Sequence, residues 1–160
     1  FGVVGLPYGP LAGGVLTGKY NKGSKYVNCG DRPMEKCRLV NQPGFQPRYG
    51  CPVAMQAAQK YIELAEQYGI TPLELALAWA KQRWYNTSII IGTTTVKQVE
   101  ECVNAFTIEE LPESLMKAID LVHEEFRNPA MHYTNKDSVL AAPWLGDQAY
   151  AAKDAGPAPA

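Results

Sequence analysis

The residues best suited to chemistry lie where a β-branched run meets a helical pattern, in the stretch SIIIGTTTVKQVEEC at residues 88–102. Gly92 and three threonines gather main-chain amides and hydroxyls at this corner. Free amides at a helix N-terminus, together with the positive end of the helix dipole, suit a phosphate. The same residues suit a capping box, in which Thr95 accepts from the amide of Gln98 and Gln98 reaches back to the cap amide. The residues alone leave both interpretations open, a helix cap or an anion cradle.

Two apolar segments, each followed by a loop and a helical pattern, indicate the architecture. Val3 to Pro7 and Ser88 to Ile91 are expected to be neighbouring parallel strands, the second buried on both faces. A first helix is expected over 54–68, ended by Gly69, with its inward face formed by Met55, Ala58, Ile62 and Ala65. Two more are expected after the capping box of Thr71 and Glu74 and after Thr95, the latter with Val99, Cys102, Val103 and Phe106 buried. A last helix is expected from Pro112 to about Arg127, with its inward face formed by Leu115, Ile119, Val122 and Phe126. Helix 54–68 is expected to pack outside the strands, and residues 21–52 to form a long polar loop. A (β/α)8 barrel needs about 250 residues, so this α/β chain of 160 residues predicts part of a barrel with open strand edges.

Composition limits the class of protein. A net charge of -1 and 19% charged residues give no electrostatic reason to expect nucleic acid or an anionic membrane as partner. No apolar run approaches the roughly 20 residues of a transmembrane segment. The four cysteines lack CxxC spacing and the two histidines lie apart, so no metal site is expected and a soluble reducing compartment, cytoplasmic or inside an organelle, is the default. Because the sequence begins at Phe1 inside a strand pattern, its natural start is expected further upstream.

Four segments carry a resemblance to a known family: YGPLAGGVLTGKY, YGITPLELALAW, IIIGTTTVKQVEE and VHEEFRNPA. In this order and spacing they resemble the C-terminal part of the aldo-keto reductases, especially bacterial general-stress-type reductases and the β-subunits of voltage-gated potassium channels. The resemblance implies the seventh and eighth strands of a TIM barrel with their helices over residues 1–130, followed by an irregular or disordered tail over 131–160. It also implies the loops that bind NADPH.

Carried over position by position, the resemblance implies ten cofactor-binding residues: Tyr8, Gly9, Pro10, Leu11, Gly13, Lys19, Gly92, Thr94, Gln98 and Glu101. Tyr8 matches the aromatic that stacks on the nicotinamide, the alternative being a strand-end tyrosine with its hydroxyl in water. The loop 9–13 matches the segment over the pyrophosphate. Lys19 matches a phosphate-binding lysine, although a solvated surface lysine is the plain alternative, and Arg38 is a further candidate on the same loop.

At the helix start over residues 92–98, the resemblance implies that the same residues form both a helix cap and a phosphate-binding site. Thr94 and Gln98 match the site of the 2′-phosphate, and Glu101 matches the carboxylate that accepts from the adenine amino group. Two departures from the family pattern, Gly9 in place of Ser and Cys102 in place of Asn, predict weaker cofactor binding.

The family's catalytic tetrad of Asp, Tyr, Lys and His matches no position of this sequence, and His123 falls on the last helix, where a structural role is expected. The resemblance therefore implies the C-terminal part of an NADPH-dependent reductase of aldehydes and ketones, inactive by itself. The alternative is a non-catalytic accessory subunit that docks its open edge and its tail, with Trp144 and Leu145, onto a larger assembly. In either case the N-terminal half of the barrel or other subunits are expected to cover the edge, and the chain alone is expected to aggregate or bind a hydrophobic dye.

Overall fold

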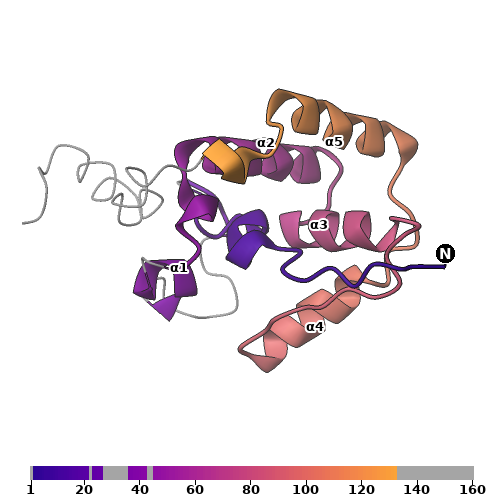
Figure 1. Ribbon diagram of the computed structural model, residues 1–160, viewed down its shortest axis with the longest axis horizontal. Coiled ribbons are helices and arrows are strands. Elements are labelled where there is room, and N and C mark those ends of the chain that lie inside the picture. The colour runs from indigo at the N-terminus through magenta and orange to yellow at the C-terminus, as the bar shows by residue number, and fades with distance from the viewer. Residues whose placement is uncertain (1, 22, 27–35, 43–44, 133–160) are drawn as a thin grey trace, which may run out of the picture.

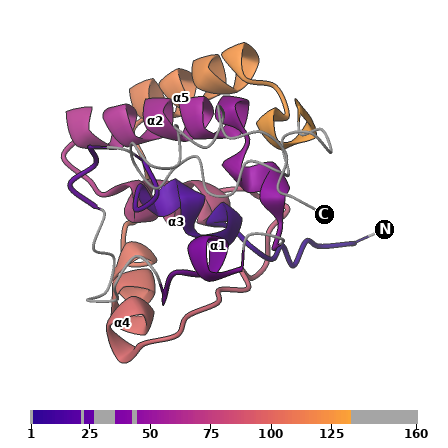
Figure 2. The same cartoon turned by 90° about the vertical axis from the view of Figure 1, so that its left-hand side faces the viewer.

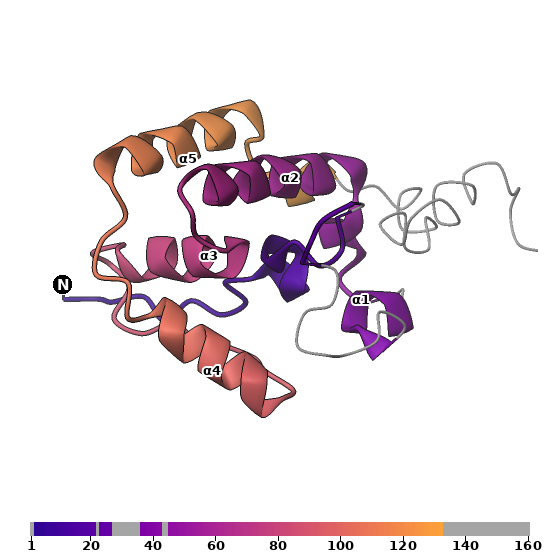
Figure 3. The same cartoon turned by 180° about the vertical axis from the view of Figure 1, so that it is seen from behind.

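A stack of helices beside two extended segments forms the described part of the molecule (Figure 1). The computed structural model describes residues 2–21, 23–26, 36–42 and 45–132. Its helices are α1 (Arg38–Asn41), α2 (Pro52–Gln67), α3 (Pro72–Lys81), α4 (Val96–Ala105) and α5 (Glu113–Glu125), with short 3-10 turns η1 (Ala12–Thr17), η4 (Pro47–Gly50) and η5 (Pro129–His132). The longer helices follow one another across the stack in the order α5, α2, α3, α4 in every view (Figure 2, Figure 3).

Local signals in the sequence fix where the central helices begin and end. The hydroxyl of Thr71 accepts from the amide of Glu74 at 3.2 Å, and the Glu74 carboxylate accepts from the amide of Thr71 at 2.7 Å, which confirms the capping box. Helix α2 ends before Gly69, whose φ of +71° closes the helix in the left-handed region. The amides of Gly69 and Ile70 then donate back to the last turn of α2, to Glu66 O and Ala65 O.

The main apolar cluster lies between α2, α3 and α5. Ala65 from α2, Leu75 and Ala78 from α3, and Leu115 and Ile119 from α5 are buried against one another. The predicted inward faces of α2 and α5 are therefore confirmed, apart from Phe126, which is only half-buried. This cluster holds three helices from distant parts of the sequence in one unit.

The predicted buried face of α4 is partly wrong. Cys102 is buried as expected, and Ala105 joins it under α3. Val99 and Val103 are instead 42% and 53% exposed, because α3 covers only the side of α4 that carries Cys102 and Ala105. The valines form part of an apolar strip that no described residue covers.

The two predicted strands are present as extended segments and not as continuous strands. Two isolated parallel bridges join them, Gly5 with Asn86 and Tyr8 with Ile90. The amide of Gly5 donates to Tyr85 O at 2.6 Å, and that of Ile90 donates to Pro7 O at 3.0 Å. Their parallel neighbourhood is confirmed, but a two-stranded pair alone is marginal and here makes only part of a ladder.

Burial of the isoleucine strand on both faces is also wrong for this chain, since Ile90 is 53% exposed. The described helices cover one side of the extended pair, where Ile91 packs against α3 and α4. Val3 and Val4, consecutive residues whose side chains point to opposite faces of the extended segment, are 84% and 57% exposed, as the open-edge prediction requires. The fold thus presents an apolar edge that the described residues leave open.

Two further expectations need correction. Helix α2 was expected to pack outside the two extended segments. It packs instead on η1, α3 and α5, and α3 lies between α2 and α4 (Figure 1). The expected polar loop over 21–52 contains α1 and η4, whose residues Leu39 and Tyr49 pack into a second apolar cluster. The tail that holds Trp144 and Leu145 lies outside the described residues.

Close approach of the two extended segments at Gly5 leads to a stability prediction. A Cβ at Gly5 would stand 3.0 Å from Tyr85 O and 3.0 Å from the side-chain oxygen of Asn86. The first contact is main chain and cannot yield, so we expect Gly5→Ala to lower the free energy of unfolding by about 1–3 kcal/mol. Urea unfolding of the chain fused to a soluble carrier, followed by circular dichroism, measures this change.

Gly92→Ala is the matched control, because a Cβ there meets no atom within 4 Å and the φ of Gly92 is not positive. We expect it to leave stability unchanged or to raise it by about 0.4–1 kcal/mol. Equal losses in the two variants would contradict the pairing of the extended segments.

Candidate functional site

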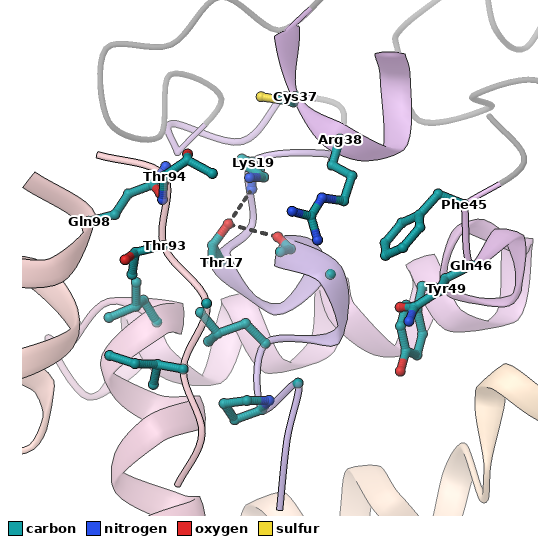
Figure 4. Close-up of a pocket in the computed structure, with 18 of the residues that line it drawn as sticks. Thr17, Lys19, Cys37, Arg38, Phe45, Gln46, Tyr49, Thr93, Thr94 and Gln98 are labelled. Atoms are coloured by element: carbon teal, nitrogen blue, oxygen red, sulfur yellow. Dashed lines mark hydrogen bonds between the residues drawn. The ribbon is translucent and has the colours of Figure 1, made fainter. Parts of the chain in front are cut away.

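A cleft of about 530 Å³ lies between the ends of the two extended segments and residues 36–42 and 45–49. Figure 4 shows the residues that face it from these different parts of the chain. Nine of the ten residues expected to bind the cofactor line this cleft: Tyr8, Gly9, Pro10, Leu11, Gly13, Lys19, Gly92, Thr94 and Gln98. Glu101 does not line the cleft and lies half-buried on α4. The fold therefore brings two sequence segments about 80 residues apart to one place, through the parallel pairing described above.

The first wall of the cleft is the glycine-rich turn at η1. Gly14 has a φ of +96°, and a Cβ there would lie 2.7 Å from Cε of Lys19, so a glycine lets the lysine fold back over the turn. The hydroxyl of Thr17 donates to Gly14 O at 2.8 Å and accepts from the amide of Lys19 at 3.5 Å (Figure 4). Sequence reasoning missed both Gly14 and Thr17, although the GG pair was a visible turn signal.

The second wall comes from α1, η4 and the residues beside them, and the sequence analysis missed almost all of it. It contributes two cations and two aromatic rings to the lining, from Lys36, Arg38, Phe45 and Tyr49. The guanidinium of Arg38 lies 5.1 Å from the centroid of the Phe45 ring, which fixes the side chain beside the cleft. Only Arg38 was considered from the sequence, because the polar insert offered no periodic pattern.

A backbone outlier shapes this second wall. Gln46, which immediately precedes η4, has a φ of +47°. A positive φ is uncommon for residues other than glycine. In the same turn Arg48 stacks over the ring of Tyr49 at 4.8 Å and donates to its hydroxyl at 3.4 Å. This hydrogen bond to Tyr49 raises the pKa of Arg48.

Charge is strongly segregated at the cleft. Lys19, Lys36 and Arg38 line it, and among the described lining residues none is acidic. The whole sequence, in contrast, has 16 acidic and 15 basic residues. A cleft with an excess of cations and a helix N-terminus at its rim favours an anionic ligand.

That rim is the corner before α4, where the structure refines the predicted cap. Thr95 is the cap and its hydroxyl accepts from the amide of Gln98 at 3.2 Å, as expected. The Gln98 side chain, however, does not reach the cap amide. Its Oε1 accepts from the amide of Thr94 at 2.8 Å and from the Thr94 hydroxyl at 3.1 Å. The corner is therefore a capping arrangement displaced by one residue.

Two other kinds of site find no support in the described part of the chain. No group of three or more His, Cys, Asp or Glu residues there is placed to hold a metal ion. The helices described are all too short or too polar to cross a membrane.

Comparison with known proteins now decides the family. The sequence pattern of the aldo/keto reductase family matches residues 1–124, which is most of the chain. The chain belongs to the aldo-keto reductase family. Membership implies a (β/α)8 barrel, and aldo-keto reductases generally use NADPH.

Individual aldo-keto reductases and relatives match at moderate identity. The protein is 30% identical over 129 residues to Protein tas of Escherichia coli, covering 81% of this chain and 34% of that protein. It is 32% identical to an aldo-keto reductase of Babesia bovis, covering 80% of this chain and 43% of that protein. It is 33% identical to a putative voltage-gated potassium channel subunit beta of Schizosaccharomyces pombe, covering 75% of this chain and 34% of that protein. The matched part of the chain thus spans about a third to two fifths of these relatives.

Proposed function

We propose that this chain forms the cofactor-binding part of an NADPH-dependent reductase that converts aldehydes and ketones to alcohols. In this proposal the extended segments 3–7 and 88–91 are the seventh and eighth strands of the reductase barrel. The observation that carries the proposal is the cleft: its described lining residues include three cations and no acid, at the ends of two parallel segments. Carboxyl ends of strands in such barrels are where active sites are built.

The residues of the cleft fit the cofactor chemically. Lys19, Lys36 and Arg38 would neutralise phosphates, and the amides and hydroxyls before α4 would donate to the 2′-phosphate. Tyr8 offers a flat ring that is 76% exposed at the end of its segment, suited to one face of the nicotinamide. When bound, NADPH supplies the hydride that reduces the carbonyl carbon.

The chain's own residues would bind and orient the cofactor, while the proton donor would come from the remaining strands of the barrel. Those strands would also cover the exposed side of Val3, Val4 and Ile90. Under this proposal the N-terminal part of the barrel is the partner of this chain. The alternative of a non-catalytic accessory subunit has no specific feature of the described residues in its favour.

Charge at the corner tests the proposal. Gln98→Glu places a negative charge beside the expected 2′-phosphate. We expect the free energy of NADPH binding to become less favourable by about 1–3 kcal/mol. Because an acidic residue in the first turn of α4 suits both the helix dipole and the Thr94 donors, the fold should not lose stability. NADPH fluorescence titration and urea unfolding, on the chain fused to a soluble carrier, measure the two quantities separately.

Ser114→Glu is the matched control, since it adds the same charge to an exposed position in the first turn of α5, on the opposite side of the stack. It should leave NADPH affinity unchanged. No NADPH binding by the unaltered chain, or equal affinity in the chain and in Gln98→Glu, would contradict the proposed site.

A further inference from the structure

Arg83 has no oxygen acceptor among the described residues. Its guanidinium lies 4.3 Å from the ring of Trp79, and its Nη2 donates to the thioether sulfur of Met116 at 3.7 Å. The buried Nε of Arg83 and the buried Nε1 of Trp79 have no hydrogen-bond partner in the described part of the chain. A thioether is a weak acceptor, whereas a partly desolvated guanidinium is normally satisfied by a carboxylate. A carboxylate brought to Arg83 would complete this half-buried side chain.

Two aromatic side chains follow Arg83 and stand out from the surface. Trp84 is 91% exposed and Tyr85 is 44% exposed, and their rings meet edge to face with the centroids 5.5 Å apart. Trp, Tyr and Arg are the residue types in which the binding energy of protein interfaces is concentrated. The composition of residues 83–85 is therefore typical of a contact with another protein surface.

Acidic side chains lie at the same end of the stack. The ammonium of Lys81 donates to Phe106 O at 2.8 Å and to Ile108 O at 2.9 Å, which holds the link between α4 and α5 against the end of α3. Glu109 and Glu110 come next in that link, are exposed, and form no ion pair with a described residue. Figure 1 and Figure 3 show this link, the end of α3 and the start of the chain at one end of the stack.

We propose that this end of the stack binds a second copy of the chain in a two-fold symmetric contact. The surface concerned, called the end patch, consists of Arg83, Trp84, Tyr85, Glu109 and Glu110. In a two-fold contact the same patch of each copy meets the other, so each kind of pair forms twice. Arg83 of one copy takes the carboxylates of Glu109 and Glu110 of the other, and the aromatic rings pack between the two pairs.

Self-complementary charge favours a second copy over other occupants. The end patch holds a cation without an anion and two anions without a cation, among the residues described. An acidic peptide would satisfy Arg83 and be repelled by the carboxylates, and a basic partner would do the reverse. Only a partner with the same mixed pattern satisfies both, and the chain itself has that pattern.

The proposed contact leaves the candidate cofactor cleft free. Gly5, which bonds to Tyr85 O, lies at the start of the parallel pair beside the end patch. Tyr8 and Ile90, which form the later bridge, line the cleft. The end patch and the cleft are therefore at opposite ends of the extended pair. The inference goes beyond the proposed function, and self-association is expected with or without a cofactor.

Charge reversal tests the pairing directly. Arg83→Glu brings like charges together across the contact, and so does the double variant Glu109→Arg, Glu110→Arg. We expect the unaltered chain to form a dimer and each variant by itself to associate about tenfold more weakly. An equimolar mixture of the two variants restores opposite charges at both symmetric pairs, so its association should return to that of the unaltered chain. Sedimentation velocity, with a monomeric soluble carrier at the C-terminus of each chain, measures these affinities.

Glu100→Arg is the matched control, because it reverses an exposed acidic residue of α4 outside the end patch. It should leave association unchanged. Equal association in all samples would overturn the proposal and assign the association to the open edge at Val3 and Val4. A monomer in every sample, or weaker association without recovery in the mixture, would overturn it as well. If circular dichroism shows that Arg83→Glu loses its helices, the exposed acid variant decides, and unchanged association there overturns the contact.

Discussion

Replacing Leu115 by alanine is expected to lower the free energy of unfolding by about 2–5 kcal/mol. Leu115 is fully buried, and it lies in the cluster that joins α2, α3 and α5. Truncation leaves a cavity between three helices, each anchored by its own neighbours, so the surroundings cannot collapse to fill it. Because a domain has only about 5–15 kcal/mol of net stability, this single change removes a large share. Urea unfolding of the chain on the same soluble carrier, followed by circular dichroism, gives the measurement.

Leu121→Ala is the matched control on the same helix. Leu121 is 70% exposed, so its truncation should change stability by no more than about 0.5 kcal/mol. A similar loss in the two variants would show that α5 does not pack on α2 and α3 through the face described.

Alone in solution, the 160-residue chain is expected to bind a hydrophobic dye and to associate. Trp84 and Val3 are 91% and 84% exposed, near the point where the amide of Gly5 donates to Tyr85 O. Large apolar side chains left exposed at an open edge mark an interaction site or an aggregation liability. Each buried hydrogen bond left unmade along the extended pair costs a further 1–3 kcal/mol or so. Several such losses are comparable with the whole stability of a domain.

Dye fluorescence and analytical ultracentrifugation of the chain without a carrier measure this expectation. The double variant Val3→Thr, Trp84→Gln should lower the dye signal and the tendency to associate. Leu121→Gln, an exposed apolar side chain on the far side of the stack, should do neither. A monodisperse monomer of the unaltered chain that melts cooperatively and excludes the dye would contradict the open edge.

Several features of the fold could be predicted because their causes are local. The Thr71 and Glu74 box and Gly69 fix the ends of α2 and α3 through bonds within a few residues, so the sequence contains all that determines them. Helical spacing likewise identified the buried faces of α2 and α5, because any partner must pack on the apolar stripe. Hydrophobic pattern also placed segments 3–7 and 88–91 side by side.

Exposure of Val99, Val103 and Ile90 could not be predicted in the same way. An apolar pattern shows which residues favour burial, whereas burial itself depends on whether a covering element exists. Only the tertiary arrangement shows that α3 covers one side of α4 and that the described residues leave the other side of the extended pair open.

For the candidate site, the resemblance of the sequence to a known family named two loops and most of the lining residues expected to bind an anion, from Tyr8 to Lys19 and from Gly92 to Gln98. Tertiary structure alone supplied the second wall, with Lys36, Phe45 and Tyr49, because those residues reach the cleft through packing of α1 and η4. It also decided that Gln98 bonds to Thr94 and not to the cap residue, since two acceptable partners lay one residue apart. Sequence spacing names the donors at such a corner, and only the folded geometry decides which acceptor each one takes.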